Sequence, residues 1–235
     1  MIYDIAGLRI DIKNKFKFTD KFCEGYLSTD QTSKTDMITE VSDEEFSVEK
    51  ANSPEFSDGY IENLCIYRKI CNRAPDFDRF LLHCSVVEHG GFAYAFSGRS
   101  GAGKSTHSKL WVKYLPDAKF LNGDKPIIGY ENGGFFVYGT PWQGKENYGY
   151  NGKVQLKNVC FIEQATKNEI AQISVGDFAD RIFAQTLMPS TADGAVKTLD
   201  LLDKLVKTVP AYVLKCDISY EAFETSFGTL AKDVK

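Results

Sequence analysis

The alternation of hydrophobic and polar residues in the first third of the chain predicts short, separate elements. Residues 2–12 alternate roughly between apolar and polar side chains, which indicates a strand pair or one long strand. Residues 28–59 are rich in Ser, Thr, Asp and Glu, and we expect only short strands and turns there. Residues 60–70 carry apolar side chains at helical spacing, and Pro75 ends the helix that this spacing predicts.

After residue 76 the pattern predicts a mixture of hairpins, further strands and helices. The hairpins are expected at 80–97 and 126–138, each with a turn that contains Gly. The further strands are expected at 119–121, 154–164 and 209–216, with 168–174 pairing with the second of these. The helices are expected at 105–114, 178–188, 195–206 and 220–231. In the third helix, one apolar face is expected to hold Val196, Leu199, Leu202 and Leu205. So many hairpins favour an α/β protein whose sheet is mixed.

Residues 98–105 form a complete GxxxxGK[ST] phosphate-binding loop, Gly-Arg-Ser-Gly-Ala-Gly-Lys-Ser. Its glycines allow the backbone N–H groups to point inward, and a helix that begins near Lys104 adds its positive dipole end. Lys104 would then reach the β- and γ-phosphates, and the Ser105 hydroxyl would bind Mg²⁺. The residues expected to bind nucleotide are Gly98, Arg99, Ser100, Gly101, Ala102, Gly103, Lys104, Ser105 and Thr106. The alternative is a Gly-rich turn without a ligand, but an apolar strand before the loop and a helix after it favour a nucleoside triphosphate site.

Composition narrows the classes of partner. The chain has 235 residues, 43% of them hydrophobic, and a net charge of −4 without a basic block, which argues against nucleic acid. No apolar run approaches the ~18 residues of a membrane span, and the N-terminus does not resemble a signal peptide. The six cysteines form no CxxC pair, so we expect reduced thiols and no structural zinc in a cytoplasmic protein.

Several segments together resemble one known family. They are Leu82-His83-Cys84-Ser85, the loop at 97–106, Asn122-Gly123-Asp124, and the stretches 138–145 and 156–164. This set resembles the HPr kinase/phosphorylase family, and more closely its shorter bacterial relatives, which share a nucleotide core with ATP-dependent phosphoenolpyruvate carboxykinase. The resemblance spans residues 78–217. It implies a kinase core of mixed sheet and flanking helices over residues 77–235, with a variable, strand-containing N-terminal part over residues 1–76 packed on it.

The resemblance implies an ATP- and Mg²⁺-dependent kinase that phosphorylates a hydroxyl, with a serine of a small carrier protein as the family's acceptor. The family usually has two adjacent Asp residues, for metal binding and base catalysis, where this chain has Gly123 and Asp124. One carboxylate must therefore serve both roles, or one role is met elsewhere or lost. This difference weakens the prediction of catalysis but not the prediction of nucleotide binding.

Asp124, His83 and Lys104 are the expected catalytic residues. Asp124 is expected to bind Mg²⁺ together with Ser105 and to accept the hydroxyl proton, and the alternative is a turn residue in Asn-Gly-Asp. A histidine on an apolar strand is usually a core residue. The resemblance supports a second role for His83 equally well, as a group beside the γ-phosphate. Lys125 is a candidate for stabilising the transferred charge.

A Gly-flanked loop downstream is a candidate lid or acceptor site. It spans residues 139–145 and contains Thr140, Trp142, Gln143 and Lys145, and loops carry function more often than their share of the chain. The alternative is a surface loop whose Trp packs on the core.

Three functions follow, in decreasing order of support. The first is a kinase acting on a hydroxyl, with Ser of a protein or peptide as the favoured acceptor. The second is a nucleotide-binding regulatory module with little or no turnover, and the third is a small-molecule kinase or carboxykinase-like enzyme. The sequence does not name the acceptor, and it leaves a homo-oligomer open.

Overall fold

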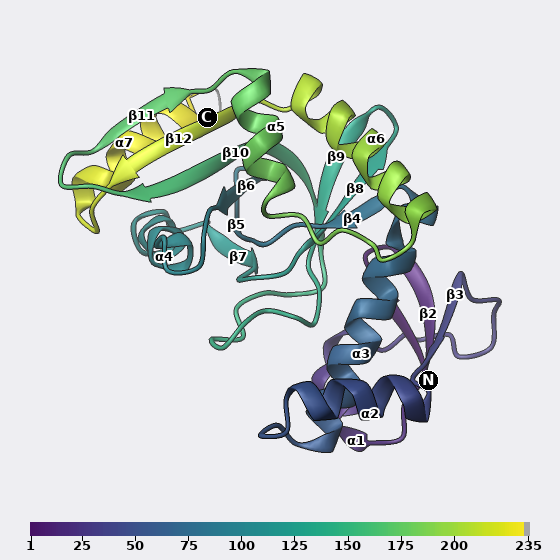
Figure 1. Cartoon of the computed structure of the whole chain (residues 1–235). Coiled ribbons are helices and arrows are strands. Elements are labelled where there is room, and N and C mark those ends of the chain that lie inside the picture. Colours follow the sequence, from purple (N-terminus) through teal and green to yellow (C-terminus); the bar gives the residue numbers. More distant parts are fainter. Residues whose placement is uncertain (233–235) are drawn as a thin grey trace.

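A computed structural model describes residues 1–232 and contains a small N-terminal sheet beside a larger sheet (Figure 1). The N-terminal sheet has the strand order β1-β2-β3, and helices pack on both sheets. The predicted class is confirmed: an α/β fold with a mixed sheet, flanking helices and a strand-containing N-terminal layer. Within residues 1–232, no helix has the length and apolar character needed to cross a membrane.

The N-terminal layer is built from three strands and several short helices. The strands are β1 (Ile2–Ile5), β2 (Leu8–Lys13) and β3 (Met37–Glu40). The helices are α1 (Lys17–Phe22), η1 (Glu24–Tyr26), α2 (Asp43–Asn52), α3 (Asp58–Arg73) and η2 (Ala74–Phe77). The expectation of strands and turns alone at 28–59 is wrong at α2. Because α2 is polar on nearly every side, its start is set by a capping box between Ser42 and Glu45 and not by apolar spacing.

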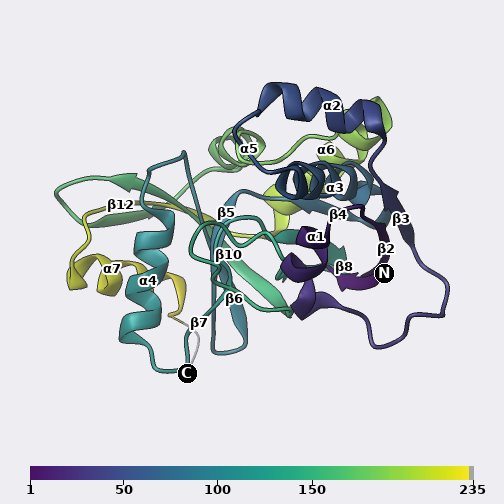
Figure 2. The same cartoon turned by 90° about the horizontal axis from the view of Figure 1, so that it is seen from below.

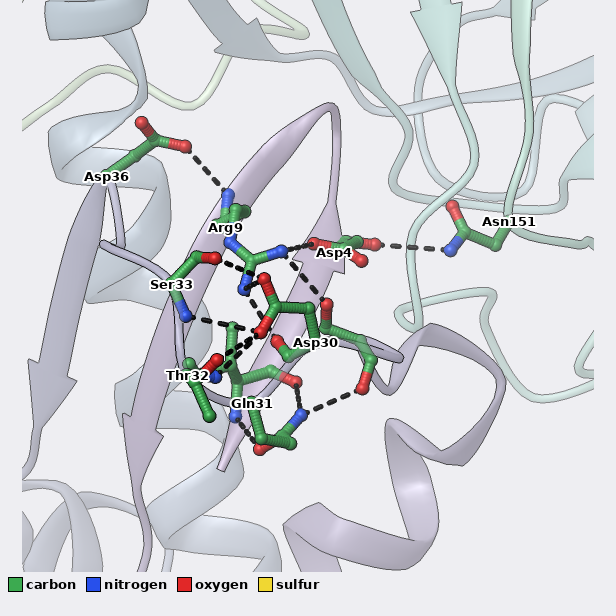
Figure 3. A network of polar contacts seen from close by, with 10 residues as sticks. Asp4, Arg9, Asp30, Gln31, Thr32, Ser33, Asp36 and Asn151 are labelled. Atoms are coloured by element: carbon green, nitrogen blue, oxygen red, sulfur yellow. Dashed lines mark hydrogen bonds and ion pairs between the residues drawn. The ribbon is translucent and has the colours of Figure 1, made fainter.

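Polar and apolar contacts join this layer to the rest of the chain. Arg9 holds the segment that leads into β3, because its Nη2 donates to the Asp30 carbonyl (2.6 Å) and its backbone N–H to the Asp36 carboxylate (2.8 Å; Figure 3). Asn151 of the core donates to the Asp4 carbonyl (3.2 Å). An apolar cluster also runs from α3 to Trp142. The layer is therefore packed on the core, while the boundary expected between residues 76 and 77 stays a prediction.

The large sheet branches at its longest strand. Its strands are β4 (Arg79–Leu81), β5 (Cys84–His89), β6 (Phe92–Ser97), β7 (Lys119–Asn122), β8 (Ile127–Glu131), β9 (Gly134–Tyr138), β10 (Lys153–Gln164), β11 (Glu169–Gln172) and β12 (Ala211–Cys216). The order is β4-β8-β9-β10-β6-β5-β7, and β12 pairs with β10 and β11. β10 is antiparallel to β9 at its start and parallel to β6 and β12 further on. The expected pairing of 168–174 with 154–164 is wrong, because β11 pairs with β12 instead.

Helices cover both faces of this sheet (Figures 1 and 2). α4 (Lys104–Tyr114) and α7 (Tyr220–Leu230) share one apolar cluster with it, and α5 (Val175–Phe183) and α6 (Ala192–Thr208) share another. α5 begins and ends before the predicted 178–188. In α6, Leu202 and Leu205 are buried, but Val196 and Leu199 are 57% and 46% exposed. Three successive steps of three residues turn a helix by about 180°, so Val196 and Leu205 lie on opposite sides.

Candidate phosphate-binding and acid–base site

The loop at 98–105 connects β6 to α4, which is the strand–loop–helix setting that the sequence predicts. Gly98 and Gly103 have φ angles of +142° and +104°, a region that favours glycine. A Cβ at Gly98 would lie 3.1 Å from the Ile162 carbonyl oxygen of β10, so the loop passes close to the neighbouring strand. No side chain caps the N-terminus of α4, where Gly103 is the N-cap. The loop therefore offers backbone N–H groups at a helix start, the geometry that binds anions.

Lys104 lies over this loop. Its Nζ donates hydrogen bonds to the carbonyls of Gly98 (2.9 Å) and Arg99 (3.2 Å), and the side chain is largely buried. Burial lowers the pKa of Lys104, and the negative charge of Asp124 opposes that shift. An anion on the loop would supply better acceptors than neutral carbonyls. Arg99, Ser100 and Thr106 are exposed along the same loop.

Asp124 lies beside two cationic or titratable groups. Its Oδ1 is 3.2 Å from His83 Nε2, and its Oδ2 is 3.1 Å from Lys125 Nζ. Burial raises the pKa of the Asp124 carboxyl, but the hydrogen bond from His83 and the charge of Lys125 outweigh it and bring the pKa to about 2. Asn122 fixes the turn, because its Oδ1 accepts from the backbone N–H groups of Asp124 (2.9 Å) and Lys125 (2.8 Å). Asp124 is thus an oriented, ionised carboxylate.

His83 lies in a break between β4 and β5, so the first strand of the hairpin expected at 80–97 is two strands. Its backbone N–H donates to the Gln185 carbonyl (2.9 Å), and its carbonyl accepts from the Ser97 hydroxyl (3.0 Å) at the start of the phosphate loop. The break turns the imidazole toward Asp124 and leaves it partly exposed. The structure therefore brings His83, Lys104 and Asp124 together from three separate segments.

Ser105 and Asp124 line one cavity of about 340 Å³. Within residues 1–232 no group of three or more His, Cys, Asp or Glu side chains is arranged to hold a metal. Mg²⁺ in nucleotide sites is typically held by one or two carboxylates, substrate phosphates and water. A hydroxyl and a single carboxylate facing one cavity are donors of this kind, so the residues present fit a Mg²⁺ ion that arrives with a triphosphate.

Gly123, at the position where the resemblance implies a second carboxylate, is closely packed. A Cβ there would lie 2.8 Å from the carbonyl oxygen of Gln143 and 3.3 Å from that of Tyr148. An Asp side chain at 123 therefore has no room in this arrangement. The sequence places Gln143 in the candidate lid or acceptor loop, but nothing in a single sequence marks a backbone carbonyl, of Gln143 or of Tyr148, that approaches a distant glycine.

The predicted lid residues divide into two buried ones and an exposed one. Thr140 is fully buried, and its hydroxyl donates to the Lys125 carbonyl (2.7 Å). Trp142 packs on Tyr67 of α3, with ring centroids 4.9 Å apart, and its Nε1 donates to Asn63 (3.1 Å). Lys145 is exposed at the cavity that Ser105 and Asp124 line. Trp142 thus matches the interpretation of a loop whose Trp packs on the core, and Lys145 is the residue of the three placed to meet a ligand.

Two larger cavities flank the phosphate loop. One, of about 770 Å³, lies toward α5 and includes Arg99, Glu163 and Arg181. The other, of about 380 Å³, lies toward the end of β12 and includes Thr106, Cys216 and Ile218. Both volumes suit small ligands or parts of larger ones.

No family model matches the sequence, and no curated protein matches it. Among solved structures, one similar chain is the HPr(Ser) kinase/phosphatase from Coxiella burnetii, with a TM-score of 0.34 and 9% identity. The match covers 62% of this chain and 91% of that one. Membership of the kinase family stays a prediction, and the function proposed below rests on the geometry of the site.

Proposed function

We propose that the chain binds a nucleoside triphosphate, with ATP the first candidate, in the loop at 98–105 and transfers its terminal phosphoryl group to a hydroxyl. The observation that carries this proposal is that the phosphate loop, with Lys104 over it, lies beside the ionised Asp124–His83 pair. The loop with Lys104 suits a triphosphate, and the Asp124–His83 pair suits the hydroxyl that accepts the phosphoryl group. A serine of a protein or peptide is the favoured acceptor, as the sequence resemblance implies.

Each residue has a role that follows from its surroundings. Lys104 exchanges its two loop carbonyls for phosphate oxygens, and the backbone of the loop binds the remaining phosphate charge. Ser105 and Asp124 would hold Mg²⁺, which neutralises phosphate charge when it is bound. His83 and Lys125 orient the Asp124 carboxylate.

Asp124 is a weak base, since its pKa is held at about 2. A weak base is sufficient here, because phosphoryl transfer passes through a loose transition state in which positioning matters more than early proton removal. Asp124 therefore orients the attacking hydroxyl through a hydrogen bond. As the new O–P bond forms, the bond from the γ-phosphorus to the bridging oxygen breaks, the hydroxyl proton moves to the carboxylate, and ADP leaves with the electron pair of the broken bond.

A second candidate function is a nucleotide-binding module with little turnover. The observation that favours it is the close contact at Gly123, which leaves no space for a second carboxylate. Such a module would bind ATP as tightly as the kinase but would not pass on its phosphate. The hypotheses of a small-molecule kinase and of a carboxykinase-like enzyme rank below these two candidate functions.

Transfer of labelled γ-phosphate from ATP to serine-containing peptides and small hydroxyl compounds separates the two candidates. A kinase labels at least one acceptor, and Asp124→Asn lowers the rate by about a thousandfold while the binding of metal-free ATP is kept. Asp203→Asn is the matched control, because it removes an exposed carboxylate that is paired with Lys207 on α6. Tight ATP binding without labelling of any acceptor would favour the module.

A further inference from the structure

The segment at 143–149, called the strap here, crosses the cavity that Ser105 and Asp124 line. Its first residue is held by the N-terminal layer, because Gln143 Nε2 donates to the Tyr26 hydroxyl (3.4 Å). Its last residue, Gly149, forms a β-bridge with Asn122. Between these ends, the Tyr148 ring stacks on Phe120 with centroids 4.7 Å apart. The strap is thus fixed at both ends and by an aromatic contact.

The backbone of the strap fills the place beside Gly123. The Gln143 carbonyl oxygen would lie 2.8 Å from a Cβ at 123, the atom from which a second carboxylate would extend. Gln143 is buried, and its carbonyl accepts no hydrogen bond from any residue within 1–232. The same cavity is lined by Gln143, Gly123, Asp124 and Ser105. A backbone carbonyl of a cavity-lining residue that has no protein donor can accept a hydrogen bond from a bound ligand or its water.

We infer that the strap completes the Mg²⁺ end of the site, with the Gln143 carbonyl in the place of the missing second carboxylate. Mg²⁺ keeps several of its waters, and each water needs acceptors around it. The oxygens of Asp124 already accept from His83 and Lys125. The Gln143 carbonyl is an additional acceptor for a water on the metal, and the single cavity places it within the same space. This inference rests on the proposed nucleotide site.

The metal dependence of ATP binding is then expected to depend on the strap. Mg²⁺ and the strap would stabilise each other, because a water on the ion would donate to a carbonyl that no protein group donates to. The factor by which Mg²⁺ tightens ATP binding measures how strongly the protein prefers Mg–ATP over free ATP. Loosening or displacing the strap should therefore reduce this factor and leave the binding of metal-free ATP unchanged.

Two variants change the strap in different ways. Gly144 has a φ angle of +79°, and a Cβ there would lie 3.0 Å from Asp124 Cβ, so Gly144→Ala forces the strap away from Asp124. Gly133→Ala is its control, since Gly133 also has a φ of +79° but a Cβ there meets no atom within 4 Å. Tyr148→Ala loosens the strap through the loss of the contact with Phe120 and adds no group near Asp124. Its control is Tyr130→Ala, which removes a similar contact with Phe135 (4.9 Å) in the β8–β9 hairpin.

The experiment is a calorimetric titration of ATP into each protein, once in EDTA and once in excess Mg²⁺. We expect both strap variants to lower the ratio of the two affinities by about fivefold or more, and both controls to keep the wild-type ratio. A fall with Gly144→Ala alone would assign the effect to Asp124 and overturn the inference. An unchanged ratio in both strap variants, while wild type binds ATP, overturns it without touching the proposed function. No ATP binding by wild type in either buffer overturns both.

Discussion

The two halves of the site are built in different ways. The phosphate loop is one continuous run, 98–105, whose glycines, lysine and helix start all lie within a few residues of one another. The acid–base half is assembled from the β4–β5 break at His83, the turn at 122–125 and the strap at 143–149. The first half is encoded by local spacing, and the second depends on tertiary packing. We therefore expect the first half to tolerate changes elsewhere in the chain and the second to respond to them.

The sharpest test of this difference compares two lysines. Lys104 is buried over the phosphate loop, and Lys125 is more exposed and pairs with Asp124. We expect Lys104→Ala to weaken ATP binding by about a thousandfold, or about 4 kcal/mol, because it removes charge-assisted hydrogen bonds to phosphate.

Lys125→Ala should change ATP affinity by no more than about threefold, and should lower the rate of transfer by about tenfold to a hundredfold. Calorimetry and labelled-phosphate transfer measure the two effects. Equal losses of ATP affinity in the two variants would remove the distinction between the halves.

The next effect concerns a histidine behind the phosphate loop. His107 of α4 is buried, its Nε2 lies 2.9 Å from the Ser226 hydroxyl, and burial lowers its pKa to about 4. An unfolded His binds a proton below pH ~6.5, so between that value and pH ~4 the unfolded state binds more protons. Stability therefore falls as pH falls through this window, by about 3 kcal/mol in total.

Urea unfolding at pH 7 and pH 4.5 measures this loss, and His107→Gln is expected to lack most of it. A His107→Gln protein that keeps the wild-type pH dependence would show that burial of this imidazole is not its source.

The smallest of the three effects probes the contact at Gly123. Gly123→Ala places a Cβ 2.8 Å from the Gln143 carbonyl oxygen, and we expect a loss of about 2 kcal/mol in stability from overpacking. Gly25→Ala is the control, because neither residue needs a positive φ and a Cβ at Gly25 meets no atom within 4 Å. Chemical denaturation measures the change in the free energy of unfolding for both variants.

Gly123→Asp extends the same test to function. We expect it to lower the transfer rate, because the side chain displaces the strap. A rise in that rate would show that the second carboxylate can be restored in this fold.

What could be predicted from the sequence follows the same division. The phosphate loop, its strand and its helix follow from glycine spacing and apolar runs, and they lie where the sequence predicts them. α2 was not predictable from apolar spacing, because its start depends on a polar capping box. The apolar residues Val196 and Leu199 gave the wrong face of α6, because steps of three residues drift around a helix.

The acid–base half was predictable only in part. Asp124 was identified by its place after a strand, and His83 by resemblance, but their pairing depends on a break in the strand that the sequence did not indicate. Trp142 was a candidate for ligand contact, yet it is buried against α3 of the N-terminal layer. The role of Gln143 lies in a backbone carbonyl, and every residue has one, so a single sequence carries no signal for it.

The most direct test of the central claim is a calorimetric titration of ATP into the wild-type protein in the presence of Mg²⁺. The structure predicts saturable binding of one ATP per chain that inorganic tripolyphosphate competes away, since the loop at 98–105 binds the phosphates. No saturable binding at ATP concentrations up to about 1 mM, which corresponds to about −4 kcal/mol, would contradict a triphosphate site in this loop.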